Sequence, residues 1–218
     1  MPSWTGRLIL VRHAKTIDNI ADRFCGWTDS ALSEEGLAAA EHLAAFVRDT
    51  YPAIDYLYSS PLGRARVTAG LIGLAIRREP IEEEGLREIH FGDIEGLTRS
   101  EFQTAYPSEY QTWSTTHDIS YRWPGGESRE AFHRRVRETI DRLIGRHPGC
   151  TVLAVSHGGC IAGYVSTVID GNLNTWRDRN PDNCSVTEIV FADGRAELIR
   201  FNDTSFLTPA EAAEQRSL

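Results

Sequence analysis

The chain has 218 residues, of which 41% are hydrophobic and 25% charged, and its formal net charge of −8 argues against broad electrostatic affinity for DNA or RNA. Its four cysteines form no CxxC pair and no zinc-type spacing with histidine, which indicates a reduced, cytoplasmic protein. No segment is apolar over a bilayer-spanning length, and residues 1–7 lack the cationic start and apolar core of a secretion signal, so we expect no membrane association.

Three apolar runs along the chain each lead into a cationic or imidazole side chain. The first covers residues 8–11 and ends in Arg12 and His13. Short apolar runs bounded by polar residues are typical of buried strands, and the carboxyl edge of such strands is where open α/β folds bind ligands. We therefore expect one cationic pocket at that edge. The other two runs are residues 57–60, followed by Arg64, and residues 151–156, followed by His157.

Helical periodicity follows each of these predicted strands. Ser33 with two glutamates behind it predicts a helix start, and Pro52 predicts the end of that helix. Alternating strands and helices, without a repeat or a linker, predict one α/β domain over residues 1–218 with a mostly parallel sheet. The further predicted elements are strand 54–59, helix 64–75, strand 81–86, helix 128–146, helix 159–169, strands 186–191 and 197–201, and a loose terminal helix in 208–218.

Residues 91–126 form the least regular part of the chain and are rich in glycine, proline and aromatic residues. A segment of this length between regular elements is usually functional, often as a lid. We expect its aromatic side chains, which lie between residues 102 and 123, mainly to pack the segment against the domain. The histidines that we expect to be structural or solvated are His42, His90, His117, His133 and His147.

A pocket that holds Arg12, Arg64 and two histidines requires a ligand with concentrated negative charge. Guanidinium groups form paired hydrogen bonds with phosphate oxygens, and an imidazole can attack a phosphoryl group as a nucleophile. No metal is needed if the guanidinium groups neutralise the developing charge. The leaving alkoxide still needs a proton, and Glu88, in the string LREIHFGD, is the natural general acid ahead of its acidic neighbours.

Six motifs follow one another along the chain: LVRHAKTxxN at 10–19, GWTDSALSEEG at 26–36, SSPLGRARVTA at 59–69, LREIHFGDIEG at 86–96, WPGGES at 123–128 and VSHGG at 155–159. In this order they resemble the histidine phosphatase superfamily, also called the phosphoglycerate mutase-like family, over nearly the whole chain. The resemblance implies a three-layer α/β/α fold with a mostly parallel central sheet, in which residues 91–126 are a lid-like insertion that covers the substrate.

The resemblance also implies a role for each matching residue. His13 would be the nucleophile that becomes phosphohistidine. Glu88 would protonate the leaving oxygen and then deprotonate the water that cleaves phosphohistidine. Arg12, Arg64 and His157 would hold the phosphoryl oxygens, and neither a metal nor a cofactor is implied. The positions expected to help bind the substrate are Asn19, Gly26 and Gly158.

The first motif departs from the usual pattern of the family at two positions. Ala14 stands where glycine is usual, and Lys15 stands where glutamate or glutamine is common. Alanine adds a single methyl group, so we expect the chemistry to survive. Lys15 either adds a positive charge near the mouth of the site or points to solvent.

Together these features predict a metal-independent phosphomonoesterase that acts on a small phosphorylated metabolite through a phosphohistidine intermediate. The nearest alternative is a cofactor-dependent phosphoglycerate mutase. The moderate length of the insertion and the form of residues 125–128 argue against it, whereas His90, two residues after Glu88, favours it. Less favoured are a phosphoprotein phosphatase and a phospho-ligand-binding module without turnover. The substrate cannot be read from the sequence, and a homodimer stays open.

Overall fold

The computed structural model describes residues 5–116 and 118–216, so the expectations for residues 1–4 and for His117 lie outside it. The described residues form a six-stranded sheet with the order β3-β2-β4-β1-β5-β6. The strands are β1 (Gly6–Arg12), β2 (Tyr56–Ser59), β3 (Ile81–Glu82), β4 (Thr151–Ser156), β5 (Val186–Ala192) and β6 (Arg195–Asp203).

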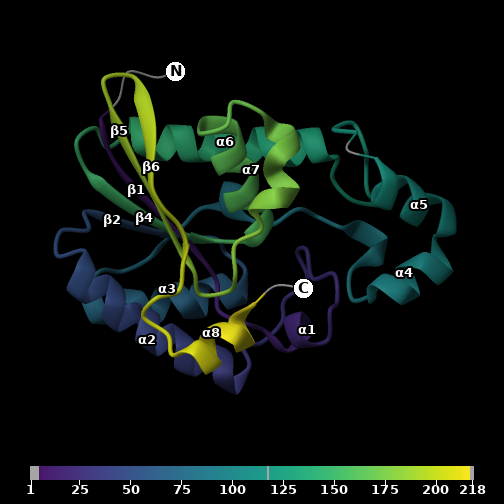
Figure 1. Ribbon diagram of the computed structural model, residues 1–218, viewed down its shortest axis with the longest axis horizontal. Helices are drawn as coiled ribbons and strands as arrows, with labels where there is room; N and C mark the ends of the chain where they lie inside the picture. Colours follow the sequence, from purple (N-terminus) through teal and green to yellow (C-terminus); the bar gives the residue numbers. More distant parts are fainter. Residues whose placement is uncertain (1–4, 117, 217–218) are drawn as a thin grey trace.

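Helices cover both faces of this sheet (Figure 1). The α-helices are α1 (Ile17–Ile20), α2 (Glu34–Thr50), α3 (Gly63–Ile76), α4 (Arg99–Ala105), α5 (Pro107–Thr115), α6 (Arg129–Gly145), α7 (Gly158–Val168) and α8 (Pro209–Gln215). Short 3₁₀ turns are η1 (Glu84–Leu86), η2 (Gly92–Ile94) and η3 (Leu173–Arg179).

The strand directions confirm the predicted mostly parallel sheet. Strand β4 pairs in parallel with both β1 and β2, and β3 pairs in parallel with β2. Strand β5 runs antiparallel to β1 and to β6. Because β1, β2 and β4 point the same way, their carboxyl ends meet at one edge, where Arg12 lies opposite Ser156 in the register. The residues that follow these strands therefore converge.

Strand β1 shows how the three layers are built. Successive side chains of a strand point to opposite faces. Leu8 and Leu10 pack in one core cluster with α6, α7 and residues of the insertion. Ile9 and Val11 pack in a second cluster with α2 and α3. The expected three-layer α/β/α arrangement is confirmed, and both faces of β1 are buried from Leu8 to Arg12.

The predicted helix boundaries agree closely with those observed. Helix α2 begins after Ser33, whose hydroxyl oxygen accepts a hydrogen bond from the Gly36 N–H at 3.0 Å, and it ends at Thr50, before Tyr51 and Pro52. The predicted strand at 81–86 is too long, because only Ile81 and Glu82 pair with β2. The Glu83 carboxylate accepts from the Gly85 N–H at 3.2 Å and turns the chain into η1.

The insertion is more regular than its composition indicates. It contains α4, which begins with a reciprocal cap between Thr98 and Glu101, and α5, which begins at Pro107. Its aromatic residues pack as expected: Phe102 is fully buried, and the ring of Phe24 contacts it edge-on at a centroid distance of 5.7 Å. The insertion is therefore fastened to the core through aromatic contacts.

Across the described parts of the chain, no helix is both long and apolar enough to cross a membrane.

Candidate active site

A cavity of about 180 Å³ opens at the carboxyl edge of β1, β2 and β4. Seven of the eight site residues predicted from the sequence line it, and they come from segments that are far apart in the chain. These seven are Arg12, His13, Asn19, Gly26, Arg64, Glu88 and Gly158. The cavity walls also include Arg23, Phe24, Cys25, Phe91, Gly159 and Asn180.

His13 follows β1 and is held in one orientation. Its Nδ1 lies 2.8 Å from the Ala14 carbonyl oxygen. Since a carbonyl can only accept, Nδ1 carries the hydrogen and Nε2 carries the lone pair. Burial and the charges of Arg64 and Arg12 lower the pKa of His13 well below its ordinary value. The ring is therefore neutral near pH 7, with one nitrogen available as a nucleophile.

The two guanidinium groups of the cavity are positioned by main-chain carbonyl oxygens. Arg12 Nη1 donates to the Pro181 carbonyl at 2.5 Å. Arg64, which is 2% exposed at the start of α3, donates to the carbonyls of Gly26 at 2.6 Å and Thr28 at 3.0 Å. Burial lowers the pKa of Arg12 to about 10, so the group is still a cation at neutral pH. Two fixed positive charges thus face one cavity.

Gly26 occupies a position that a side chain would obstruct. Its φ is +51°, a left-handed conformation that favours glycine. A Cβ atom there would lie 2.1 Å from Glu95 Oε1. That carboxylate also accepts from the N–H groups of Trp27, Thr28 and Phe91. Glu95 therefore shapes the loop whose Gly26 carbonyl holds Arg64.

His157 lies beside His13, with the ring centroids 5.1 Å apart, but it is not among the residues that line the cavity. It is fully buried, and its Nε2 lies 2.8 Å from Ser60 Oγ. Ser60 Oγ already accepts from the Leu62 N–H at 3.3 Å, so its own hydrogen is available to Nε2. In the tautomer in which Ser60 donates to Nε2, the imidazole hydrogen is on Nδ1, which has no hydrogen-bond partner among the described residues.

Glu88 caps the amino terminus of α7 from across the cavity. Its Oε2 accepts from the Gly159 N–H at 3.0 Å, and its Oε1 accepts from the Ile89 N–H at 2.9 Å. A Cβ atom at Gly159 would lie 2.5 Å from Oε1, so a larger residue there would displace the Glu88 carboxyl group. The half-buried carboxyl group is therefore held at the cavity wall within reach of a bound ligand.

Three residues that position the site were not identified from the sequence. The Glu88 carbonyl accepts from Trp27 Nε1 at 2.8 Å and from Arg135 Nη2 at 3.2 Å. The His13 carbonyl accepts from Asn183 Nδ2 at 3.0 Å. Two sequence motifs contained a signal for these residues. Trp27 belongs to GWTD, and Glu127, which pairs with Arg135 at 2.8 Å, belongs to WPGGES.

Lys15 is half-buried and does not line the cavity. Its ammonium group donates to the carbonyls of Glu214 and Arg216 at the end of α8. Its main-chain N–H donates to Gln215 Oε1 at 3.3 Å, and the Gln215 carbonyl accepts from the Asn183 N–H at 3.0 Å. Lys15 therefore fastens the carboxyl-terminal helix to the loop that follows β1.

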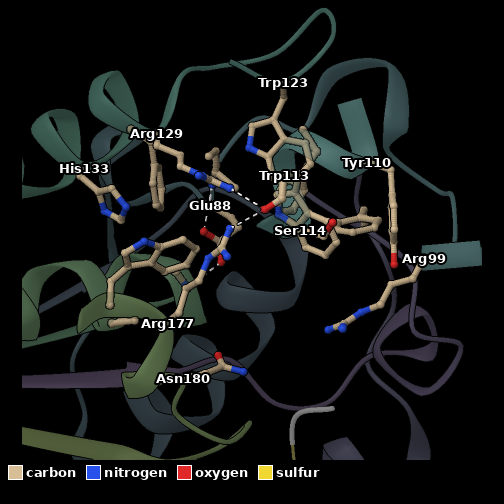
Figure 2. Close-up of a pocket in the computed structure, with 17 residues that line it drawn as sticks. Glu88, Arg99, Tyr110, Trp113, Ser114, Trp123, Arg129, His133, Arg177 and Asn180 are labelled. Carbon is tan, nitrogen blue, oxygen red and sulfur yellow. Dashed lines mark hydrogen bonds between the residues drawn. The ribbon is translucent and has the colours of Figure 1, made fainter. Parts of the chain in front are cut away.

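A second, larger cavity of about 510 Å³ adjoins the first (Figure 2). Five residues line both cavities, so the two are neighbours: Phe24, Glu88, Phe91, Gly159 and Asn180. The larger one is bounded by the insertion, by α6 and α7 and by η3. His133, expected to be structural or solvated, lines it instead. Most of its other side chains are aromatic or cationic: Phe24, Phe91, Arg99, Tyr110, Trp113, Trp123, Arg129, Phe132, Trp176 and Arg177.

His90 lies outside both cavities. Its ring packs on Trp27 at a centroid distance of 4.7 Å, and its Nε2 lies 3.8 Å from Glu95 Oε1. The expectation that His90 is structural therefore agrees with its contacts, which belong to the cluster that supports the loop around Gly26.

Comparison with known proteins agrees with the family that the sequence motifs resemble. The family model of the histidine phosphatase superfamily (branch 1) matches residues 8–204. Phosphoserine phosphatase 1 of Hydrogenobacter thermophilus is 31% identical over 202 residues, which cover 92% of this chain and 94% of the relative. A probable phosphoglycerate mutase of Erwinia tasmaniensis is 31% identical over 183 residues, which cover 84% of each chain.

Similar three-dimensional structures are also known. The alpha-ribazole phosphatase from Shigella flexneri superposes with a TM-score of 0.82 at 26% sequence identity, and the match covers 91% of this chain and 96% of that one.

Proposed function

The chain belongs to the histidine phosphatase superfamily of enzymes, and we propose that it is a metal-independent phosphomonoesterase that hydrolyses a small phosphorylated metabolite through phosphohistidine on His13. One observation carries the proposal. A neutral imidazole with its Nδ1 hydrogen-bonded to a carbonyl, two guanidinium cations and a carboxyl group all line one cavity. These are the groups that phosphoryl transfer to nitrogen requires.

In the first proposed step, Nε2 of His13 attacks the phosphorus atom and the bond from phosphorus to the ester oxygen breaks. Arg12 and Arg64 stabilise the negative charge on the phosphoryl oxygens. The carboxyl group of Glu88 donates a proton to the departing oxygen, so that the alcohol leaves uncharged. The Nδ1 hydrogen of His157 is the donor that this ring can offer to the same phosphoryl group.

In the second proposed step, water attacks the phosphohistidine and the bond from phosphorus to Nε2 breaks. The Glu88 carboxylate accepts a proton from this water, which restores the carboxyl group and releases inorganic phosphate. The hydrogen bond from Nδ1 to the Ala14 carbonyl persists through both steps and stabilises the positive charge that the ring carries while it is phosphorylated.

Relatives support a small metabolite as the substrate. Those described above are named for their action on phosphoserine and on alpha-ribazole phosphate, which are small phosphate monoesters. The four cysteines of the chain are all free, which supports our further proposal of a reducing, cytoplasmic location.

A phosphoglycerate mutase is the second candidate function, because several relatives, among them the one from Erwinia tasmaniensis, carry that name. A mutase and a phosphatase share the first step and differ in whether water reaches phosphohistidine before the phosphoryl group returns to an alcohol. Incubation with 3-phosphoglycerate separates them: a phosphatase releases inorganic phosphate, whereas a mutase forms 2-phosphoglycerate without net release.

The proposed activity is tested by measuring inorganic phosphate release from a panel of phosphate monoesters, with and without EDTA. We expect turnover of at least one member and equal rates in both conditions, because the chain's own cations stabilise the transition state. Inhibition by EDTA that added metal reverses would contradict the proposed mechanism.

A further inference from the structure

Two of the three arginines that line the larger cavity meet at one carbonyl oxygen, whereas the third, Arg99, pairs with Asp22 at 3.6 Å. Arg129 and Arg177 both donate to the carbonyl oxygen of Trp113, at 3.3 Å and 2.9 Å. Figure 2 shows the two guanidinium groups converging on this one oxygen. Among the described residues, neither arginine forms an ion pair, and Glu88 is the only acidic residue that lines the cavity. In a chain with a net charge of −8, such a wall favours an anionic ligand.

The two arginines differ in how firmly they are bound. Arg129 is 2% exposed and donates further hydrogen bonds to the carbonyls of Thr116 at 3.0 Å and Asp118 at 3.1 Å. It fastens the insertion to the start of α6. Arg177, in η3, is half-buried and makes its hydrogen bond to Trp113 with a single nitrogen. A guanidinium has five N–H donors, so Arg177 keeps several for a ligand.

Buried polar atoms of two other residues in the wall independently indicate a ligand. Trp123 is 3% exposed and His133 is 6% exposed, and both line the cavity. Trp123 Nε1 and both ring nitrogens of His133 have no hydrogen-bond partner among the described residues. Buried polar atoms are almost always hydrogen-bonded in native proteins. The indole N–H can only donate, so its partner has to be an acceptor, as an anionic oxygen is.

The aromatic part of the wall suits the remainder of such a ligand. Trp113, Trp176 and Tyr110 line the same cavity and offer flat apolar surfaces. Burial lowers the pKa of His133 to about 4, so this ring is neutral at pH 7 and adds both a donor and an acceptor. The cavity of about 510 Å³ is large enough for an organic group of ring size or larger.

We propose that the larger cavity binds the leaving-group part of the substrate, and that this part carries a second anionic oxygen group, a carboxylate or a phosphate, which pairs with Arg177 and Arg129. This inference rests on the proposed function, in which Glu88 protonates the leaving oxygen. Because Glu88 lines both cavities, the leaving group lies next to the larger one. The preferred substrates are then phosphate monoesters whose alcohol part carries a carboxylate or a second phosphate, rather than monoesters of neutral alcohols.

The test compares three aryl phosphates of matched size: 4-carboxyphenyl phosphate, its neutral isostere 4-carbamoylphenyl phosphate, and 1,4-phenylene bisphosphate. For the wild type we expect kcat/KM for at least one anionic ester to exceed that for the carbamoyl ester about tenfold or more, since a charge-assisted hydrogen bond in a buried site contributes that much. The better of the two anionic esters identifies the group as a carboxylate or a phosphate.

Arg177→Gln should reduce this preference to near one, because the glutamine amide carries no charge to pair with the second anionic group. The matched control is Arg195→Gln, an exposed position at the start of β6, which should keep the wild-type preference. Trp123→Phe, which removes the indole N–H but keeps an aromatic ring, should reduce the preference partly. Melting temperatures show that each variant is folded.

A wild-type preference near one, or a preference that Arg177→Gln leaves unchanged, overturns the inference while phosphate release from the three esters still supports the proposed function. If none of the esters is hydrolysed, the proposed function fails, and calorimetric dissociation constants of the same esters for the wild type still decide the inference. Equal affinity for the carboxyl, bisphosphate and carbamoyl esters would then contradict it.

Discussion

The two adjoining cavities hold their polar groups in different ways. In the smaller cavity the main chain fixes the reactive side chains: His13 Nδ1 bonds to Ala14, Arg12 to Pro181, and Arg64 to Gly26 and Thr28. In the larger cavity Trp123 and His133 line the wall with buried polar atoms that no described residue satisfies.

This difference indicates which part of the site carries out the reaction and which part selects the substrate. Side chains bonded to backbone carbonyls need little reorganisation when charge develops, which is the property of a catalytic centre. Buried donors and acceptors without a protein partner favour a ligand that supplies one. We therefore expect substitutions in the smaller cavity to affect every ester, and substitutions in the larger cavity to affect some esters more than others.

The largest effect should come from His13→Ala. Loss of the nucleophile should lower kcat on the order of 10⁴-fold or more for every ester, because the remaining groups of the site cannot take over its attack on phosphorus. Phosphate release and the melting temperature are measured together, with His42→Ala on the exposed face of α2 as the control. A variant that stays folded and keeps more than a small fraction of the wild-type rate would contradict the role of His13.

Glu88→Gln should separate esters by their leaving group. General acid catalysis contributes about 10²- to 10⁴-fold, so alkyl phosphates, which leave as poor alkoxides, should lose that much in kcat. 4-Nitrophenyl phosphate needs less protonation and should lose far less. Equal losses for both kinds of ester would show that Glu88 does not act as the general acid.

His133→Gln in the larger cavity should alter the pH dependence of stability. Burial lowers the pKa of His133 from 6.5 to about 4, so the unfolded chain binds more protons than the folded one between these values. Stability from this group is complete above about pH 6.5 and is lost as the pH falls toward 4. Between pH 7 and 5 the wild type should lose about 2 kcal/mol more than the variant in the free energy of unfolding. Urea titrations at both pH values measure this, and an equal loss in both proteins would contradict it.

The smallest effect should come from Ser60→Ala, which removes the partner of His157 Nε2. Groups that orient a functional histidine typically contribute about tenfold or somewhat more, so we expect kcat/KM to fall about tenfold for all esters. Ser59→Ala is the matched control, because Ser59 is also buried at the end of β2 but its hydroxyl donates to the Ser60 carbonyl at 2.8 Å. If both variants behave alike, Ser60 has no specific role.

The smaller cavity was predictable because its residues follow strands directly. Arg12 ends β1 and His13 follows it, His157 follows β4 beside the cavity, and the carboxyl ends of parallel strands meet at one edge. Local spacing therefore placed chemistry-bearing residues together without any knowledge of side-chain packing. The helix boundaries were predictable for a similar reason, since the cap at Ser33 acts only within its own turn.

The larger cavity was not predictable, because its walls depend on contacts between elements distant in the sequence. Arg177 and Trp113 are 64 residues apart and meet only through packing of η3 against the insertion. His133 lies on the buried face of an amphipathic helix, where a histidine is more often structural. The partners of Lys15 were not predictable for the same reason, since they lie at the end of α8, about 200 residues away.

The proposed role of His13 is tested most directly by trapping the intermediate. The wild-type enzyme is mixed with a ³²P-labelled ester, denatured within milliseconds, and digested for peptide mapping. We predict label on the peptide that contains His13, stable in alkali and lost in acid as a phosphoramidate is, with a rise that precedes phosphate release and no label in His13→Ala. Turnover without label on that peptide, or label on any other residue, would contradict a reaction through His13.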